Sequence, residues 1–272
     1  MAALSDSRIG IVDLGLQPYA EMSAIQEKLV EDRRRGRIGD LLLVLEHPPT
    51  YTRGRRSGPG DLLFGENELD RRGIAVCDTP RGGKVTYHGP GQLVMYPIVD
   101  LTGIGDQPEG VDRIDVSGFV ASLEGAMSAA LSVHGIDSAP IEGLTGLWVS
   151  RGDPIPEGAT AATMAAQVAS GKVAKIGSIG LRINRGISSH GVSLNVSCDL
   201  EPFAGITSCG IEHCQVSSVE AETDSAPSVN EIGLNVGTAL AGLLGRDIET
   251  VEPSTIGLES TARATAYSTR RR

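Results

Sequence analysis

The sequence has few aromatic residues and few cysteines, and both shortages limit what the chain can be. Aromatic side chains make up 3% of the 272 residues, so the core must depend mainly on Val, Leu, Ile and Ala. Four cysteines in a chain of this length do not indicate a disulfide framework. We read them as free thiols of a cytoplasmic protein, and one of them can serve as a nucleophile.

Long apolar runs and an excess of basic residues are also absent. No segment approaches the roughly 20 consecutive apolar residues that span a bilayer, and the N-terminus lacks the basic and apolar regions of a secretory signal. The formal net charge of −10 argues against general nucleic-acid binding. We therefore expect no membrane and no nucleic acid among the partners, and an acidic macromolecule would need a local basic patch.

What the sequence does contain is a set of short apolar runs that alternate irregularly with helical patterns. The runs predict strands at 8–15, 40–49, 73–80, 93–101, 146–150, 175–184 and 191–198. Helical spacing predicts helices at 19–36, at 117–136 with Ser117 as N-cap, and at 228–244. Because there is no regular βαβ rhythm and no clear linker, we expect an α+β fold with one catalytic domain over residues 1–250.

Three stretches do not fit strands or helices. Residues 50–63 read as a basic, glycine-rich loop. Residues 153–171 are rich in Ala, Gly, Pro and Thr with little amphipathic pattern, and we expect a mobile insertion. Residues 251–272 have no sustained apolar period, and we expect a disordered tail.

The segment RGGKVTYHGPGQLVMYPI, residues 81–98, places glycines and polar residues just before an apolar run. Glycines permit tight turns and close approach of main-chain N–H groups to a ligand. Arg81 offers a fork for a carboxylate or phosphate, and His88 can donate or accept a proton near neutral pH. The alternative is a hairpin turn with solvated charges.

Two polar residues stand next to later strands. Lys175 opens KIGSIGLRIN, where a lysine is ordinarily exposed, but inside a pocket it can lose charge by desolvation and act as a base. His190 stands directly before GVSLNV, so its backbone can join the same cleft or it can be a satisfied polar residue.

The cysteines fall into different settings. Cys77 and Cys198 lie at or in predicted strands and read as small buried hydrophobes. Cys209 lies in the loop ITSCGI beside a glycine, where a thiolate can attack an acyl carbon. Cys209, His213 and Cys214 can also be read as metal ligands, but their spacing does not match paired metal-binding motifs, and we predict no metal.

These segments together resemble one family. EHPPTYTRGR, RGGKVTYHGPGQLVMYPI, KIGSIGLRI, HGVSLNV and ITSCGI, in this order, are similar to the lipoyl(octanoyl) transferases over residues 8–245. The resemblance implies the α+β catalytic domain shared with biotin and lipoate protein ligases. Two departures are Ser208, where many members have proline before the cysteine, and the length of the 153–171 stretch.

The resemblance also implies roles for individual residues. Cys209 matches the cysteine that carries the acyl thioester, and Lys175 matches the lysine that lowers the pKa of that thiol and moves protons. Three further segments match substrate-binding residues of the family: Arg81, Gly82, Gly83, Lys84, Val85, Thr86, Tyr87 and His88; Ser178, Ile179 and Gly180; and Gly191, Val192 and Ser193.

The implied activity is transfer of an octanoyl group from octanoyl-acyl carrier protein to a lysine of lipoyl domains. The acceptors implied are the lipoyl domains of 2-oxoacid dehydrogenases and the glycine-cleavage H protein, and no cofactor is required because one thioester replaces another. Candidates for docking the acidic carrier are Arg53, Arg55, Arg56, Arg71 and Arg72.

Three other functions remain open at this point. An ATP-dependent lipoate or biotin-type ligase has no need of a cysteine beside a lysine. A non-catalytic module would bind octanoyl groups without turnover. A cysteine hydrolase would need a Cys-His-Asn arrangement, and none stands out.

Overall fold

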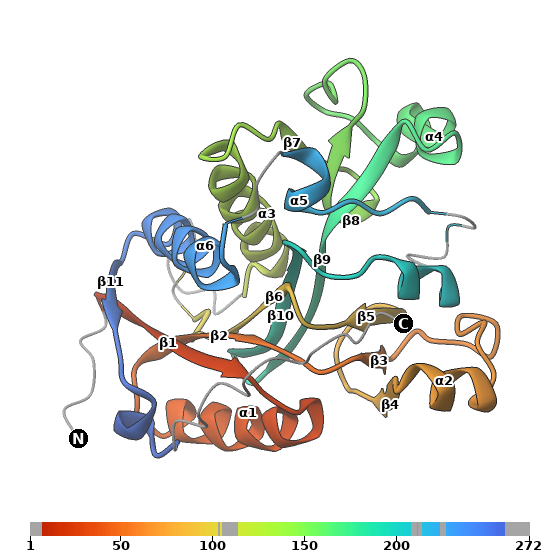
Figure 1. The fold of residues 1–272 in the computed structure, drawn as a ribbon. Helices are drawn as coiled ribbons and strands as arrows, with labels where there is room; N and C mark the ends of the chain where they lie inside the picture. Colours follow the sequence, from red (N-terminus) through yellow and green to blue (C-terminus); the bar gives the residue numbers. More distant parts are fainter. Residues whose placement is uncertain are drawn as a thin grey trace.

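Two β-sheets carry the fold in the computed structural model, which describes residues 7–102, 104, 114–207, 211, 214–223 and 227–258 (Figure 1). The strands are β1 (Arg8–Leu16), β2 (Asp40–Glu46), β3 (Thr50–Arg53), β4 (Ala75–Asp78), β5 (Val85–His88), β6 (Gln92–Ile98), β7 (Ser138–Ile141), β8 (Leu144–Ser150), β9 (Val173–Asn184), β10 (Ile187–Asn195) and β11 (Asp247–Thr250). Eight of them form a mixed sheet in the order β11-β1-β2-β6-β10-β9-β8-β7, and β4-β3-β5 form a small second sheet.

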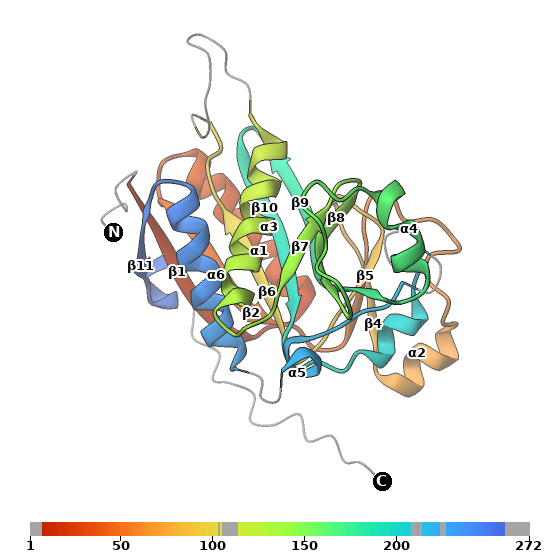
Figure 2. The same cartoon turned by 90° about the horizontal axis from the view of Figure 1, so that it is seen from above.

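Helices cover both faces of the large sheet. The helices are α1 (Tyr19–Arg34), α2 (Glu66–Arg72), α3 (Val116–Ser132), α4 (Ala161–Ala169), α5 (Val219–Glu222) and α6 (Val229–Leu243), with 3₁₀ turns η1 (Glu201–Gly205) and η3 (Pro253–Ile256). Helices α3 and α6 lie side by side on one face, and α1 lies on the other (Figures 1 and 2). The large sheet is therefore buried on both sides, between a core under α3 and α6 and a smaller core under α1.

The central strands follow from their composition. Strand β6, the LVMYPI run, is buried along its whole length between β2 and β10. Strand β2 is buried at six of its seven positions, as expected for an apolar run covered on both faces. The predicted strands and the three predicted helices are confirmed, with boundaries shifted by a few residues.

Two strands lie where the sequence predicted loops. Part of the basic segment 50–63 forms β3, which pairs with β4 and with β5. Strand β5 lies inside the polar half of the RGGKVTYHGPGQ motif. Both are only four residues long, so alternation is too brief to be recognised.

The N-cap of α3 is Asp115 and not Ser117. The Asp115 carboxylate accepts a hydrogen bond from the Gly118 N–H at 2.8 Å, which satisfies one of the donors exposed at the helix start. Both residue types are good caps, and the pattern alone could not choose between them.

The segment 153–171 was expected to have little amphipathic pattern, and this was wrong for its second half. Helix α4 begins at a capping box made by Thr160 and Thr163 and buries Met164 and Val168 against Trp148. One apolar stripe of two residues is enough to dock so short a helix. Mobility of the segment stays a prediction.

The first residues of the expected disordered tail are ordered. Val251 and Ile256 are buried in the core beneath α1, and η3 ends at Ile256. The prediction was therefore wrong for residues 251–258, and 259–272 lie outside the described residues. Among the described residues, no helix combines the length and apolar character needed to cross a membrane.

Candidate active site

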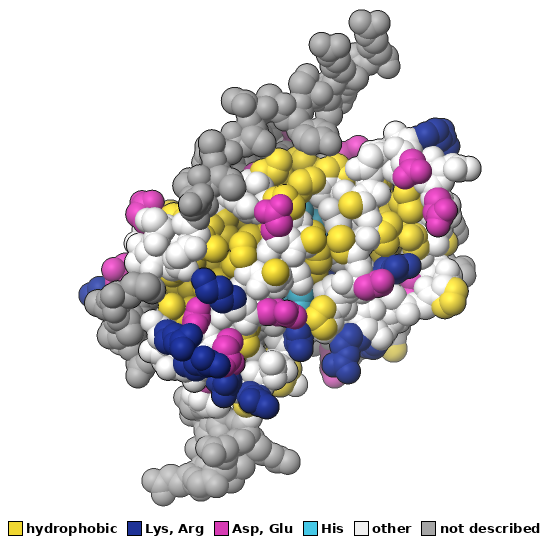
Figure 3. Space-filling view, turned by 90° about the horizontal axis from the view of Figure 1, so that it is seen from below, with side chains coloured by type: hydrophobic (Ala, Val, Ile, Leu, Met, Phe, Trp, Pro, Cys, Tyr) yellow, Lys and Arg dark blue, Asp and Glu magenta, His cyan; other side chains and the backbone are white. Residues whose placement is uncertain are grey.

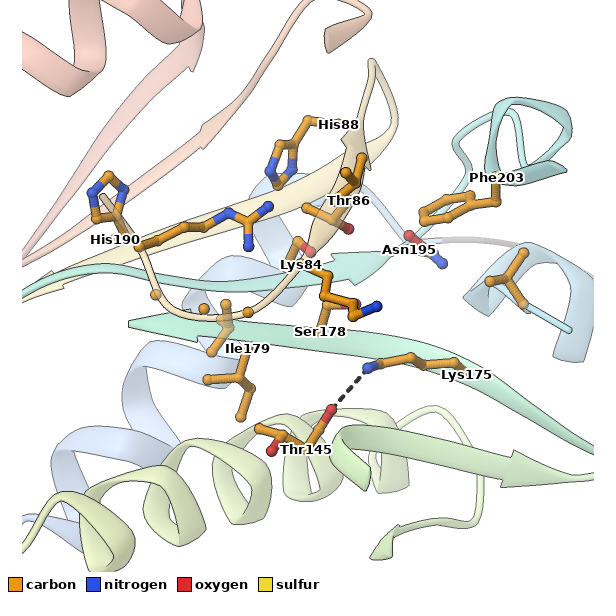
Figure 4. Close-up of a pocket in the computed structure, with 18 of the residues that line it drawn as sticks. Lys84, Thr86, His88, Thr145, Lys175, Ser178, Ile179, His190, Asn195 and Phe203 are labelled. Carbon is orange, nitrogen blue, oxygen red and sulfur yellow. Dashed lines mark hydrogen bonds between the residues drawn. The ribbon is translucent and has the colours of Figure 1, made fainter. Parts of the chain in front are cut away.

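A cavity of about 250 Å³ opens where the small sheet meets strands β9 and β10 (Figure 4). Most of the residues predicted for the site line it: Arg81, Gly83, Lys84, Val85, Thr86, His88, Lys175, Ser178, Ile179, Gly180, Gly191, Val192 and Ser193. Three of the five sequence segments that resembled one family, those at 81–98, 175–183 and 190–196, thus meet in one place. The volume lies just below the range of pockets for drug-sized ligands, about 300–1,000 Å³.

Strand pairing brings the second and third predicted segments together. In the antiparallel ladder of β9 and β10, Gly180 pairs with Gly191, Ile179 with Val192 and Ser178 with Ser193. Side chains of directly opposite residues share a face of the sheet. The two tripeptides, distant in sequence, therefore form one continuous wall of the cavity.

Lys175 is buried, with 4% of its surface exposed, so it is not the exposed lysine that a position before a strand ordinarily predicts. Its Nζ donates a hydrogen bond to the Thr145 carbonyl at 2.8 Å and lies 5.4 Å from the centre of the Trp148 ring (Figure 4). Trp148 is its register partner on β8, so the two side chains share a face. A buried amine in a substrate-sized cavity is a strong candidate for a functional group.

Arg81 lines the cavity but is tied to the protein around it. Its guanidinium donates to the Thr52 side chain at 2.8 and 3.2 Å, to the Thr52 carbonyl at 2.6 Å and to the Gly82 carbonyl at 2.9 Å. Only 7% of Arg81 is exposed. These bonds fasten the 81–84 loop to β3, so Arg81 shapes the cavity wall.

His88 is held in a buried cluster of histidine and tyrosine rings. His88 Nδ1 lies 2.7 Å from the Gln92 side-chain oxygen, and its ring stacks on Tyr19 at 6.1 Å. Behind it, His47 donates from Nδ1 to the Gln17 carbonyl at 2.6 Å, and its Nε2 accepts from the Tyr96 hydroxyl at 2.7 Å.

Burial keeps these histidines neutral. Desolvation lowers the pKa of His47 to about 4, and it lowers the pKa of His88 well below its ordinary value, helped by the nearby His47. His88 was expected to exchange protons near neutral pH, and the direction of this shift argues against a charged form there.

His190 also lines the cavity, as the sequence allowed. It adopts a left-handed backbone with φ of 53°, and its N–H donates to the Gln26 side chain at 2.7 Å. Burial, with the charges of Arg81 and Arg182, lowers its pKa to about 4. This strained residue lies inside β10, directly before Gly191 in the cavity wall, so the position contributes through its backbone.

Some residues of the glycine motif do not face the cavity. Gly82 and Tyr87 are not among the residues that line the cavity. The Gly82 N–H donates a hydrogen bond to the Leu181 carbonyl. Tyr87 packs against Phe203 in a separate apolar cluster at the small sheet. A Cβ on Gly91 would lie 2.7 Å from the backbone of Cys198. That glycine therefore makes room for protein and not for a ligand.

Cys209 lies outside the described residues, as do Ser208 and His213. The chain before it is fixed by the Thr207 N–H, which donates to the Asp61 carbonyl at 3.0 Å. The chain after it is fixed to β9, because the Lys175 N–H donates to the Gln215 carbonyl at 2.8 Å. Both described flanks of the ITSCGI loop are thus anchored near the cavity, which Phe203 and Val216 line.

The other cysteines differ from one another. Cys198 is buried, as predicted, and burial raises the pKa of its thiol to about 12. Cys77 was expected to be buried, but it is only half-buried, because β4 pairs with β3 alone in the part of the small sheet that is described. Cys214 is half-buried and packs against the cluster around Trp148.

Several lining residues were not predicted from sequence. They are Tyr19, Tyr96, Gly143, Leu144, Thr145, Asn195, Phe203 and Val216. Thr145 contributes a backbone carbonyl, which no residue type signals. Tyr96 lies inside the recognised LVMYPI run and could have been found there as the one residue in it with a hydroxyl.

Within the described stretches, no three His, Cys, Asp or Glu side chains are grouped so that they could hold a metal ion. The lining of the cavity is mixed. It combines charged side chains, among them Arg81, Lys84 and Lys175, with apolar ones such as Ile179 and Phe203. Such a lining can take a ligand that has an apolar chain and a polar reacting end.

This chain is similar to known proteins over most of its length. Residues 18–241 match the family described as lipoyl protein ligase A/B catalytic domain. An octanoyltransferase of Acidobacterium capsulatum is 38% identical over 221 residues, covering 81% of this chain and 83% of that protein. An octanoyltransferase of Mycobacterium sp. is 36% identical over 252 residues, covering 91% and 92%.

The fold matches solved structures as well. A putative lipoate protein ligase from Thermoplasma acidophilum with bound lipoic acid superposes with a TM-score of 0.60, covering 89% of this chain and 88% of that one. At 15% identity this likeness concerns the fold alone. The α+β ligase-type architecture expected from sequence is confirmed.

Proposed function

This chain belongs to the octanoyltransferases of the lipoyl protein ligase A/B catalytic domain family, and from that premise we propose its donor, acceptor and intermediate. The donor is octanoyl-acyl carrier protein, the acceptor is a lysine of a lipoyl domain, and Cys209 carries the octanoyl group between them. The acceptors would be the 2-oxoacid dehydrogenases and the glycine-cleavage H protein, in the cytoplasm.

The observation that supports this most is the buried Lys175 at the wall of an acyl-sized cavity. An ordinary thiol has a pKa near 8.5, so only a few per cent is thiolate at pH 7. An amine beside it stabilises the thiolate by charge or takes its proton. The anchored flanks of the ITSCGI loop support the same pairing, since one of them is bonded to the Lys175 backbone.

The chemistry balances without a further reactant. The Cys209 thiolate attacks the carrier's thioester carbon, the carrier thiolate leaves, and it takes up the proton that Lys175 removed from Cys209. The acceptor amine then attacks the Cys209 thioester, an amide forms, and the thiol is regenerated after Lys175 accepts the amine's proton.

We propose fewer arginines for docking the acidic carrier than the sequence suggested, because some of the candidates are paired with carboxylates. Arg53 pairs with Asp78, and Arg71 and Arg72 pair with Glu68. Arg55 and Arg56 are exposed and have no ion pair within the described part of the chain, and Arg56 lines the cavity. We assign the carrier-facing charge to these two.

The experiment that tests this function compares two variants of one loop. Wild-type enzyme mixed with octanoyl carrier protein, without ATP, should gain one octanoyl group by intact-protein mass spectrometry. Cys209→Ala should gain none, whereas Cys214→Ala, the matched control, should gain it as the wild type does. An adduct on Cys209→Ala, or transfer only from free octanoate with ATP, would contradict the proposal and favour a ligase.

A further inference from the structure

A carboxylate on α3 reaches the peptide group that binds Lys175. Glu124 Oε1 accepts a hydrogen bond from the Gly146 N–H at 2.9 Å. The Thr145 carbonyl, which belongs to the same planar peptide unit, accepts a hydrogen bond from Lys175 Nζ at 2.8 Å. Glu124 and Lys175 are therefore joined through the two ends of a single peptide group.

The peptide is confined at this place by its neighbours. Gly146 has φ of +118°, which L side chains rarely adopt. A Cβ built on Gly146 would lie 2.5 Å from the Gly177 carbonyl oxygen and 3.0 Å from Lys175 Nζ. No side chain fits between the Gly146 backbone and the amine, and the hydrogen bond that Gly146 N–H donates to Glu124 fixes the orientation of the peptide plane.

The charges of Glu124 and Lys175 suit their places at the N–H end and the carbonyl end of this peptide group. Burial raises the pKa of the Glu124 carboxyl, while the Gly146 N–H and the charge of Lys175 act in the opposite direction. Among the described residues, Lys175 is the charged group whose field acts on Glu124. A hydrogen bond to an ionised acceptor is roughly twice as strong as a neutral one, and it polarises the peptide so that its carbonyl binds a cation better.

We infer that Glu124 is a positioning residue for acyl transfer, which holds the Thr145–Gly146 peptide so that its carbonyl keeps Lys175 Nζ at the cavity. Glu124 is not among the lining residues of the cavity and acts only through that peptide. The inference rests on the proposed function, because it gives Lys175 the task of activating the Cys209 thiol.

The test is the rate of thioester formation measured against pH for the full-length enzyme. Glu124→Ala should slow the step about tenfold or more and move the apparent pKa of the profile upward, with KM for the donor unchanged. Glu124→Gln, whose side-chain oxygen can accept the same N–H, should recover most of the rate. Glu142→Ala, at an exposed glutamate just before β8, should match the wild type.

Other outcomes overturn the inference. They are an unchanged rate and profile in Glu124→Ala, a rise in KM alone, or a folded Glu124→Gln as slow as Glu124→Ala. If Glu124→Ala does not fold, Glu124→Gln decides by the same profile. Failure of the proposed function looks different, because the wild type itself would then form no thioester on Cys209.

Discussion

At the scale of single residues, the site depends on how Lys175 is held. Its amine is buried, bonded to a carbonyl and placed over an indole ring, so it has little freedom to leave the cavity. A flexible lysine would lose more entropy when it meets a substrate. A rigid placement would suit the proton transfer that we propose for Lys175.

Replacing Lys175 by Met keeps an unbranched chain as long as the lysine's carbon stem and removes the amine. We expect the rate of thioester formation at pH 7 to fall about 10²–10⁴-fold, the usual contribution of a general acid or base. Because the thiol would then titrate near its ordinary pKa of about 8.5, the rate should recover partly at higher pH. Stopped-flow or quenched-flow mass spectrometry measures this.

Lys172→Met is the matched control, since Lys172 is exposed and three residues earlier in the same chain segment. Its rate should equal that of the wild type. A Lys175→Met enzyme with an unchanged rate and pH profile would remove Lys175 from the chemistry.

At the scale of elements, α4 is a helix that the sequence pattern did not predict, because only two of its residues are buried. Its two buried residues, Met164 and Val168, pack against Trp148, which is itself the register partner of Lys175. We expect Met164→Ala to lower the free energy of unfolding by about 2–5 kcal/mol, as for other buried large-to-small changes. Urea denaturation measures it.

Gln167→Ala, at an exposed position of the same helix, should change that free energy by less than about 0.5 kcal/mol. Equal, negligible effects of both substitutions would mean that α4 is not docked most of the time. That result would favour the mobile insertion predicted from sequence.

The elements also show why prediction from sequence succeeded where it did. The long, strongly periodic segments α1, α3 and α6 and the apolar runs β2 and β6 were recognised, because burial of a whole face leaves a clear pattern. Strands β3 and β5 have four residues each and are set by pairing with each other, which sequence does not display. The capping residue of α3 depended on a side-chain hydrogen bond between two equally suitable candidates.

The site was predictable in a similar, partial way. Motif residues such as Ser178 and Gly191 were found through resemblance, and strand register explains why they meet. Thr145 was missed because its carbonyl and not its side chain is used. Arg81 was expected to face a ligand, but its bonds to Thr52 appear only when β3 is placed beside it.

At the scale of the whole molecule, the distribution of charge decides where an acidic carrier could dock. The chain has a net charge of −10, and on the face seen from below, basic and acidic side chains lie close to one another (Figure 3). Basic residues at the C-terminal end of α1 are paired, since Arg34 and the next residue, Arg35, both pair with Glu31. An acidic carrier therefore needs charges that are not already compensated, such as Arg55 and Arg56.

We expect Arg55→Gln and Arg56→Gln together to raise KM for octanoyl carrier protein several-fold and to weaken its dependence on salt, because rim charges act on encounter rates. Arg53→Gln, whose arginine is paired with Asp78, should have little effect. Steady-state kinetics at two ionic strengths provide the measurement. An equal effect of both changes, or none, contradicts the assignment.

Stability of the whole molecule should depend on pH below neutrality. The pKa values of His47 and His190 are about 4 in the folded protein and about 6.5 when unfolded. The unfolded state thus binds protons more readily, so the free energy of unfolding should fall as pH drops from about 6.5 to about 4, by up to about 3 kcal/mol per histidine.

Urea denaturation at pH 7 and pH 5 measures that loss, and a folded His47→Gln variant should lose less over the same interval. A stability that does not change between these pH values would contradict the neutral, buried state of the histidines. The loss should be complete below about pH 4, where the folded protein also takes up the protons.

We propose that Cys209, in the ITSCGI segment, carries the acyl group on its way to the acceptor. To test this, the wild-type enzyme is loaded with octanoyl carrier protein, the modified peptide is mapped by tandem mass spectrometry, and a lipoyl domain is then added. We expect octanoyl on Cys209 that disappears as the acceptor lysine becomes octanoylated. Octanoyl on Cys77, Cys198 or Cys214, or an adduct on Cys209 that the acceptor does not remove, would contradict it.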